Sequence, residues 1–296
     1  MENGYDIVIT DGDASYTVDR LRGLLTSVQG SGKELLASPV KPTIWRAPTD
    51  NDRDVKNRWY QDFYHKMQVN CHACAIDAAD ENEIRISASL ILSAPARAPL
   101  ARMNVTYVFA RGEGVRVDMD VKVEKKDAFL PRFGLEFKMP AACEQLSYFG
   151  RGPVESYADK KHASRVSRYA TTVTEHFEHY VRPQENMAHA ETRWVEVSDM
   201  AGAGLLATNT DATGAFSFNC SHFTTKMLTE TAHDYELEPL AETVVHLDYR
   251  QSGIGSNSCG PKLDEELRVN DTAFRFAVRL LPVRVNDVCP FEKTVK

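Results

Sequence analysis

The chain has 296 residues, of which 43% are hydrophobic and 26% charged, a balance typical of a folded protein with a sizeable core. Its net charge of −7 argues against nucleic acid and anionic membrane surfaces as partners. No run of 18 apolar residues occurs, and the first residues lack the basic and apolar regions of a signal peptide, so we expect neither a membrane span nor secretion.

Six cysteines are spread over the whole chain. They are too sparse for a disulfide scaffold, which fits a reducing, cytoplasmic compartment. Cys71 and Cys74 have the spacing of half a zinc site, but no second Cys or His pair follows at a matching distance. We therefore expect a β-strand whose thiols face a core, and no metal site.

Short runs that alternate apolar and polar residues make up most of the chain, and this period of two is typical of antiparallel strands with one face in water. Two segments, 57–67 and 222–231, have helical spacing instead. We predict strands at residues 6–10, 15–18, 24–28, 83–92, 103–109, 115–123, 130–139, 166–174, 194–197, 204–208, 215–218, 242–249 and 273–281. So many short strands predict an all-β sandwich. Since no linker interrupts them, residues 1–296 are expected to form a single domain.

Two polar stretches stand out from this pattern. In the first, Gly150 and Gly152 allow unusual backbone angles and Pro153 fixes its own, so we predict a rigid loop. It is expected to display Arg151, Glu155 and Tyr157. The second loop, around Pro183, carries Arg182, Gln184, Glu185 and Asn186. Such groups suit a hydroxyl-rich ligand, or they pair with one another as buried ions that hold the two loops together.

Two further stretches carry polar residues on tight turns. Asp50, Asn51 and Asp52 follow Pro48, and they favour an Asx turn over a site for a hard cation. Residues 253–261 form a loop of glycines and small polar residues. A ligand can approach such a backbone closely, although a plain connection between strands has the same composition.

No nucleophile elbow, P-loop, dinucleotide fingerprint or zinc-protease motif occurs. Glycoside hydrolysis needs two carboxyl groups roughly 5–9 Å apart. The candidates are Glu155, Glu185, Glu191 and Glu230. Sugar epimerisation would instead need a histidine with a carboxylate, such as His189 with Glu185 or His233 with Glu155. The sequence does not say which of these groups meet.

Four stretches, taken together, resemble a known family. They are Trp45–Asp52, Tyr148–Tyr157, Tyr180–Asn186 and Gly253–Cys259. In this order they are similar to the carboxy-terminal domain, or small chain, of the bacterial β-galactosidases of glycoside hydrolase family 2. The resemblance runs from near residue 20 to near residue 280. It implies an all-β fold, a large antiparallel β-supersandwich like that of galactose mutarotases.

The resemblance also implies a place within a larger enzyme. The domain would pack beside a catalytic barrel that holds two glutamates and the Mg²⁺ ligands, so no cofactor is expected in this chain. The chain would complete the active-site wall of a retaining enzyme that hydrolyses terminal β-D-galactosides, and would be inactive alone. The implied partners are the remaining domains or a large subunit, the galactoside substrate, and further copies in an oligomer.

One loop of the family reaches the substrate. The matching residues are Gly255, Ser256, Asn257, Ser258 and Cys259, with Cys259 where well-known members have a stacking tryptophan. Met187 stands where the family usually has glycine. The other motif residues are expected to fix loops at the barrel face: Arg46, Asp50, Asn51, Asp52, Arg151, Glu155, Tyr157, Arg182, Gln184, Glu185, Asn186 and Arg193. A stand-alone sugar mutarotase and a carbohydrate-binding module remain the alternatives.

Overall fold

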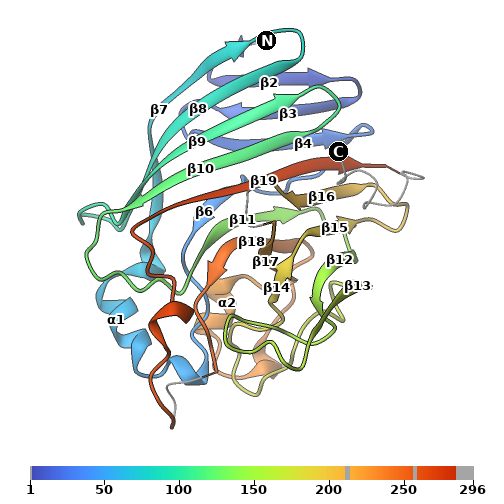
Figure 1. Ribbon diagram of the computed structural model, residues 1–296. Coiled ribbons are helices and arrows are strands. Elements are labelled where there is room, and N and C mark those ends of the chain that lie inside the picture. Colours follow the sequence, from blue (N-terminus) through green and yellow to red (C-terminus); the bar gives the residue numbers. More distant parts are fainter. Residues whose placement is uncertain (1, 211–213, 256–258, 285–296) are drawn as a thin grey trace.

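The computed structural model describes residues 2–210, 214–255 and 259–284 (Figure 1). Three sheets account for the described strands, and every pairing among them is antiparallel. The prediction of an all-β, antiparallel fold is therefore confirmed. Neither helix within the described ranges has the length and apolar character needed to cross a bilayer.

The first sheet is a meander in chain order. Its strands are β1 (Glu2–Asn3), β2 (Asp6–Asp11), β3 (Ala14–Asp19), β4 (Leu24–Gly30) and β5 (Lys33–Glu34). Alternate residues such as Ile7, Ile9, Tyr16 and Val18 are buried. The sheet thus turns one face to the core and the other to water.

The second sheet has nine strands in the order β13-β12-β15-β16-β19-β10-β9-β8-β7, and it sweeps across the whole molecule in Figure 1. Its strands are β7 (Gln68–Ala79), β8 (Glu83–Ser93), β9 (Ala101–Ala110), β10 (Val115–Val123), β12 (Gln145–Gly152), β13 (Arg165–Thr172), β15 (Trp194–Ser198), β16 (Gly204–Asn209) and β19 (Ala273–Val283). In β10 the buried residues Val115, Val117, Met119 and Val121 alternate with polar ones. The bounds predicted for this strand are the observed ones.

The third sheet has the order β14-β17-β18-β11-β6 and lies beside the helices (Figure 1). Its strands are β6 (Lys41–Thr43), β11 (Arg132–Met139), β14 (His189–Thr192), β17 (Phe216–Ser221) and β18 (Thr243–Gln251). The helical segments are α1 (Val55–Gln61), α2 (Thr225–Glu230) and 3-10 turns at Asp50–Asp52, Tyr64–Lys66, Asp234–Glu236 and Glu265–Leu267. One hydrophobic core, with Val28, Leu90 and Phe137 among its members, joins all three sheets.

Both predicted helices are shorter than expected. The first ends at Gln61 because Phe63 takes a left-handed conformation, with φ of 58°, and a separate 3-10 turn follows. The second begins only at Thr225, since the Thr224 hydroxyl accepts a hydrogen bond from the Met227 amide and caps the helix there.

The prediction of an irregular loop around Gly150 is wrong, because residues 150–152 continue β12 and pair with β13. Glycine is needed here for space rather than for an unusual backbone angle. A Cβ at Gly150 would lie 2.3 Å from the Thr192 hydroxyl oxygen. The irregular loop starts only after Gly152.

Cys71 and Cys74 lie in β7, as expected for a strand. A bulge at His72 lets both cysteines pair with inward-facing residues of β8, namely Leu90 and Ala88. Both thiols pack against the core. Burial raises the pKa of Cys74 to about 11, so this thiol is protonated at neutral pH.

Candidate functional site

Side chains of the first motif, Trp45–Asp52, contact one short piece of backbone, residues 252–255, where the fourth motif begins. The buried Arg46 guanidinium donates hydrogen bonds to the carbonyls of Ser252 and Gly253, the latter at 3.2 Å. The Asn51 side chain donates to the Ile254 carbonyl at 2.6 Å. The first motif therefore holds three successive carbonyls at the start of the fourth.

Asp159 holds the same backbone from the other side. Its carboxylate accepts hydrogen bonds from the amides of Ile254, at 2.9 Å, and Gly255, at 2.6 Å. A Cβ at Gly253 would lie 2.5 Å from the Asp159 carboxyl carbon, so only glycine allows this approach. Sequence reasoning missed Asp159. Its position two residues after Tyr157, inside a motif-bearing stretch, was the available signal.

Arg46 and Asp52 form an ion pair at 2.8 Å, with both side chains buried. Asp52 also accepts from the Thr49 amide at 2.9 Å and from its hydroxyl at 3.1 Å. The predicted turn is thus present as a 3-10 segment, and Asp52 closes it backwards onto Thr49. Because the charge of Asp52 is balanced by Arg46, this carboxylate has a structural role.

A second buried charge cluster fixes the Pro183 loop. Arg132, fully buried, contacts Asp248 at 3.0 Å and Glu185 at 3.3 Å. The amide groups of Asn219 and Gln251 donate to these carboxylates. Burial opposes the charge on Arg132, but the two carboxylates outweigh it and raise the pKa of this guanidinium. Glu185 is thereby committed to the packing of the loop.

Glu155 joins the two polar loops. It accepts hydrogen bonds from Lys160 at 2.5 Å, from the Tyr180 hydroxyl at 2.8 Å and from the Met187 amide at 3.0 Å. Met187 has φ of 49°, a left-handed conformation that glycine adopts more easily. Met187 thus takes a backbone conformation that suits the glycine expected at this position from the resemblance.

The predicted exposure of Tyr157 is wrong. It is 1% exposed and packs with Ala188 and Ile254 in a small apolar cluster. Burial raises its pKa well above the ordinary value. Tyr157 therefore packs against the 252–255 segment through Ile254. It is too buried to contact a ligand at the surface.

Gln184 ties the second loop to the first motif, and Asn186 fixes the shape of the loop. The Gln184 side-chain oxygen accepts from the Asp50 amide at 2.9 Å. Asn186 accepts from the Glu178 amide at 3.2 Å and donates to the Gln184 carbonyl at 2.9 Å. Both amides are used to shape the loop.

The remaining motif arginines lie nearer to solvent. Arg151 is in β12 and donates to Glu191 at 2.7 Å, and Lys161 shares that carboxylate. Arg193 is exposed and lies 5.1 Å from the centre of the Phe149 ring, and Arg182 is exposed beside Pro183.

The predicted histidine–glutamate pairs are not formed. His189 lies against His176, with the two Nε2 atoms 2.7 Å apart, while Glu185 is held by Arg132. His233 contacts Glu236 at 3.5 Å, and Glu155 is held by Lys160. The pattern of residues alone could not reveal these partners, because each lies on a segment whose neighbours are set by the fold.

The loop predicted to lie near substrate is described in part. Ser256, Asn257 and Ser258 lie outside the described residues. Gly255 and Cys259, which flank them, are both exposed. The described motif contacts therefore fix the point from which this loop departs.

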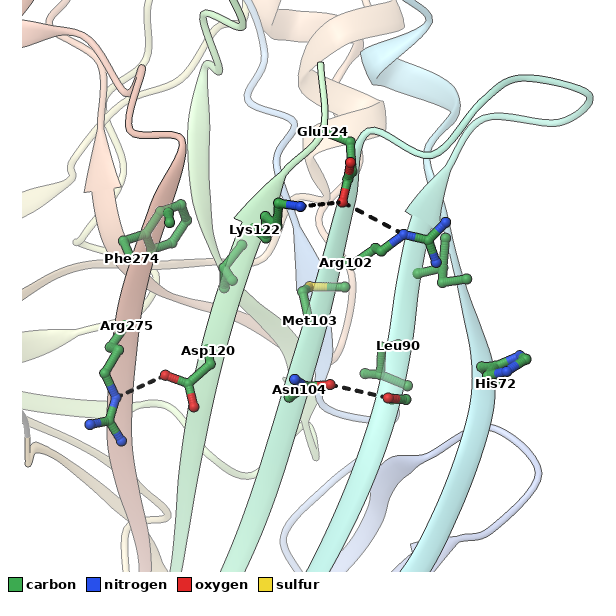
Figure 2. Close-up of a pocket in the computed structure, with 14 residues that line it drawn as sticks. His72, Leu90, Arg102, Met103, Asn104, Asp120, Lys122, Glu124, Phe274 and Arg275 are labelled. Carbon is green, nitrogen blue, oxygen red and sulfur yellow. Dashed lines mark hydrogen bonds and ion pairs between the residues drawn. The ribbon is translucent and has the colours of Figure 1, made fainter. Parts of the chain in front are cut away.

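A separate hollow lies on the wet face of the nine-stranded sheet, with a volume of about 610 Å³ (Figure 2). Arg275 pairs with Asp120 at 3.0 Å, and Glu124 pairs with Lys122 at 3.4 Å and Arg102 at 3.6 Å. These pairs are solvent-exposed and contribute little to stability. None of the four motifs lines this hollow, so the candidate site is the 252–255 region.

Comparisons with known proteins show to which family the chain belongs. The model of the beta galactosidase small chain family matches residues 10–280. A β-galactosidase of Staphylococcus xylosus is 38% identical over 266 residues, which are 90% of this chain and 26% of that protein. One of Actinobacillus pleuropneumoniae is 30% identical over 296 residues, 100% of this chain and 28% of that protein.

A galactose 1-epimerase from Lactobacillus acidophilus NCFM superposes with a TM-score of 0.49 and 9% identity, over 93% of each chain. A structural similarity with so low a TM-score and sequence identity says nothing about function. The chain spans about a quarter of the length of the curated relatives it matches. With the family model covering residues 10–280, the chain belongs to the β-galactosidase small chain family.

Proposed function

We propose that the chain is the carboxy-terminal domain of a glycoside hydrolase family 2 β-galactosidase, a cytoplasmic enzyme that hydrolyses terminal β-D-galactosides with retention. The relatives named above are β-galactosidases, and the chain matches 26% and 28% of their length. The catalytic glutamates and the Mg²⁺ would then lie in the remaining domains or a large subunit. Residues 1–296 would act as one domain of that enzyme.

The observation that carries this proposal is the use of the motif side chains. Arg46, Asp159 and Asn51 hold the 252–255 backbone, and Glu155 and Glu185 are bound to Lys160 and Arg132. These groups build a rigid support for the loop that begins at Gly253. A support of this kind suits a domain that shapes the wall of an active site lying in a neighbouring domain.

Each of the four candidate carboxylates lies beside a basic side chain: Glu155 beside Lys160, Glu185 beside Arg132, Glu191 beside Arg151 and Glu230 beside Lys226. Retaining hydrolysis needs a nucleophile and an acid of raised pKa, both open to the substrate. Partial burial opposes ionisation of Glu191, but hydrogen bonds from Lys161 and Arg151 outweigh it and lower its pKa. Glu191 is thus a poor acid. This supports the proposal that the chain by itself is inactive.

The test compares the purified chain with the enzyme that it forms together with the remaining domains. We expect no hydrolysis of a β-galactoside and no interconversion of galactose anomers by the chain alone. The assembled enzyme should hydrolyse the galactoside, and the same enzyme without residues 1–296 should not. Hydrolysis by the chain alone would disprove the proposal, and anomer interconversion alone would make it a mutarotase.

A further inference from the structure

Two large apolar side chains on neighbouring segments are exposed to water. Val181 is 85% exposed and Tyr235 is 82% exposed. Their segments are joined, because the Asp234 amide donates to the Val181 carbonyl at 3.1 Å. Single exposed apolar residues are common, but two of them on segments joined by a backbone hydrogen bond form an apolar patch that another molecule can cover.

Tyr235 is held in place by neighbouring residues. The His233 ring stacks on the Tyr235 ring, with centres 5.3 Å apart and planes 13° apart. The His233 amide donates to Glu236 at 3.0 Å and starts the 3-10 turn that carries Tyr235. His179 lies 2.9 Å from the Asp234 carboxylate. A side chain fixed before binding loses little conformational freedom on binding, which suits an interface anchor.

The pair also adjoins the two polar loops that carry Glu155 and Pro183. Tyr180, next to Val181, donates to Glu155, and Arg182 on its other side is exposed. We define the 181–235 surface as His179, Val181, Arg182, His233 and Tyr235. Tyrosine and arginine are the residue types that most often dominate the binding energy of an interface.

We propose that the 181–235 surface docks the part of the β-galactosidase that lies outside this chain. The inference rests on the proposed function and deepens it. Three observations favour this occupant: the relatives extend far beyond the length matched, the surface adjoins the motif loop around Pro183, and the exposed guanidinium of Arg182 lies next to its apolar residues in the chain. The partner surface should offer an apolar recess for Tyr235 and carboxylate or carbonyl acceptors for Arg182.

The experiment measures how fast a thiol reagent reaches this surface. Tyr235→Cys and Val181→Cys are made one at a time, with Met200→Cys as a matched control because Met200 is 83% exposed and lies on the β15–β16 turn. Each variant is labelled with a maleimide as the isolated chain and within the assembled enzyme. Peptide masses report each site separately, so that the exposed Cys259 does not interfere.

We expect the cysteines at positions 181 and 235 to react at least tenfold more slowly in the assembled enzyme, and the cysteine at position 200 to react equally in both. Equal reaction at all three positions would overturn the inference. Protection already present in the isolated chain, rising with its concentration, would assign the surface to a second copy and would also overturn it.

Galactoside hydrolysis is followed in the same samples and separates the two failures. An active assembled enzyme with a freely labelled position 235 contradicts only the docking surface. If the chain and the remaining domains form no active enzyme, the proposed function fails and the docking surface fails with it.

Discussion

His176 and His189 face each other with their Nε2 atoms 2.7 Å apart, and both side chains are buried. Their Nδ1 atoms lie against the carbonyls of Cys220 and Arg151, at 2.9 and 2.7 Å. The rings of Tyr148 and Phe218 enclose the pair. Burial lowers the pKa of His176 to about 4 and that of His189 to about 3.

The histidine pair predicts that acid destabilises the fold. The folded-state pKa values lie below the ordinary value of 6.5, so the unfolded chain binds these protons more readily. The stabilising effect is complete above pH 6.5 and is lost as the pH falls towards 4. We expect a loss on the order of 2 kcal/mol in the free energy of unfolding between pH 6.5 and 5, measured by urea unfolding.

A variant pair checks the source of this pH dependence. His176→Gln should lose part of the fall in unfolding free energy between pH 7 and 5, while His179→Gln should keep it, since His179 is exposed. The same pH dependence in wild type and His176→Gln would contradict the prediction.

Removing the charge of Arg132 should lower the free energy of unfolding strongly. Arg132→Met leaves Glu185 and Asp248 buried without their cation, and breaking a buried pair in this way costs about 3–5 kcal/mol. Arg275→Met is the control, because Arg275 is 74% exposed and pairs with Asp120 in solvent. Its unfolding free energy should change by less than about 1 kcal/mol. Similar losses in both variants, measured by chemical denaturation, would count against a special role for Arg132.

Asp159 should control the order of the 252–255 backbone. In Asp159→Ala the amides of Ile254 and Gly255 lose their acceptor, so their hydrogen exchange should speed up at least tenfold. Amides of β10 serve as the internal control and should exchange as before. Unchanged protection at Ile254 would show that Asp159 does not hold this segment.

Gly253 should tolerate no side chain. Gly253→Ala places a Cβ 2.5 Å from the Asp159 carboxyl carbon and should cost about 1–3 kcal/mol, as overpacking does. Gly260→Ala, in the same loop, meets nothing within 4 Å and should change stability by less than about 1 kcal/mol. Thermal unfolding of the two variants compares them, and an equal shift would refute the steric argument.

The strands could be predicted from the sequence because their signal is local. In β10 alternate residues face the core, and the alternation alone gave the observed bounds of Val115–Val123. The helices were predicted less well, since a left-handed Phe63 and a Thr224 cap decide their ends. Such ends depend on a single residue's conformation, which a periodic pattern does not contain.

The sequence by itself determined the all-β class, most strands and the four motifs that identify the family. Only the tertiary structure decided which side chains meet: Arg46 with Ser252, Asp159 with Gly255, and His176 with His189. The physical reason is that each contact joins segments brought together by the order of strands in a sheet. That order follows from the burial of apolar faces over the whole chain, so no single stretch of sequence records it.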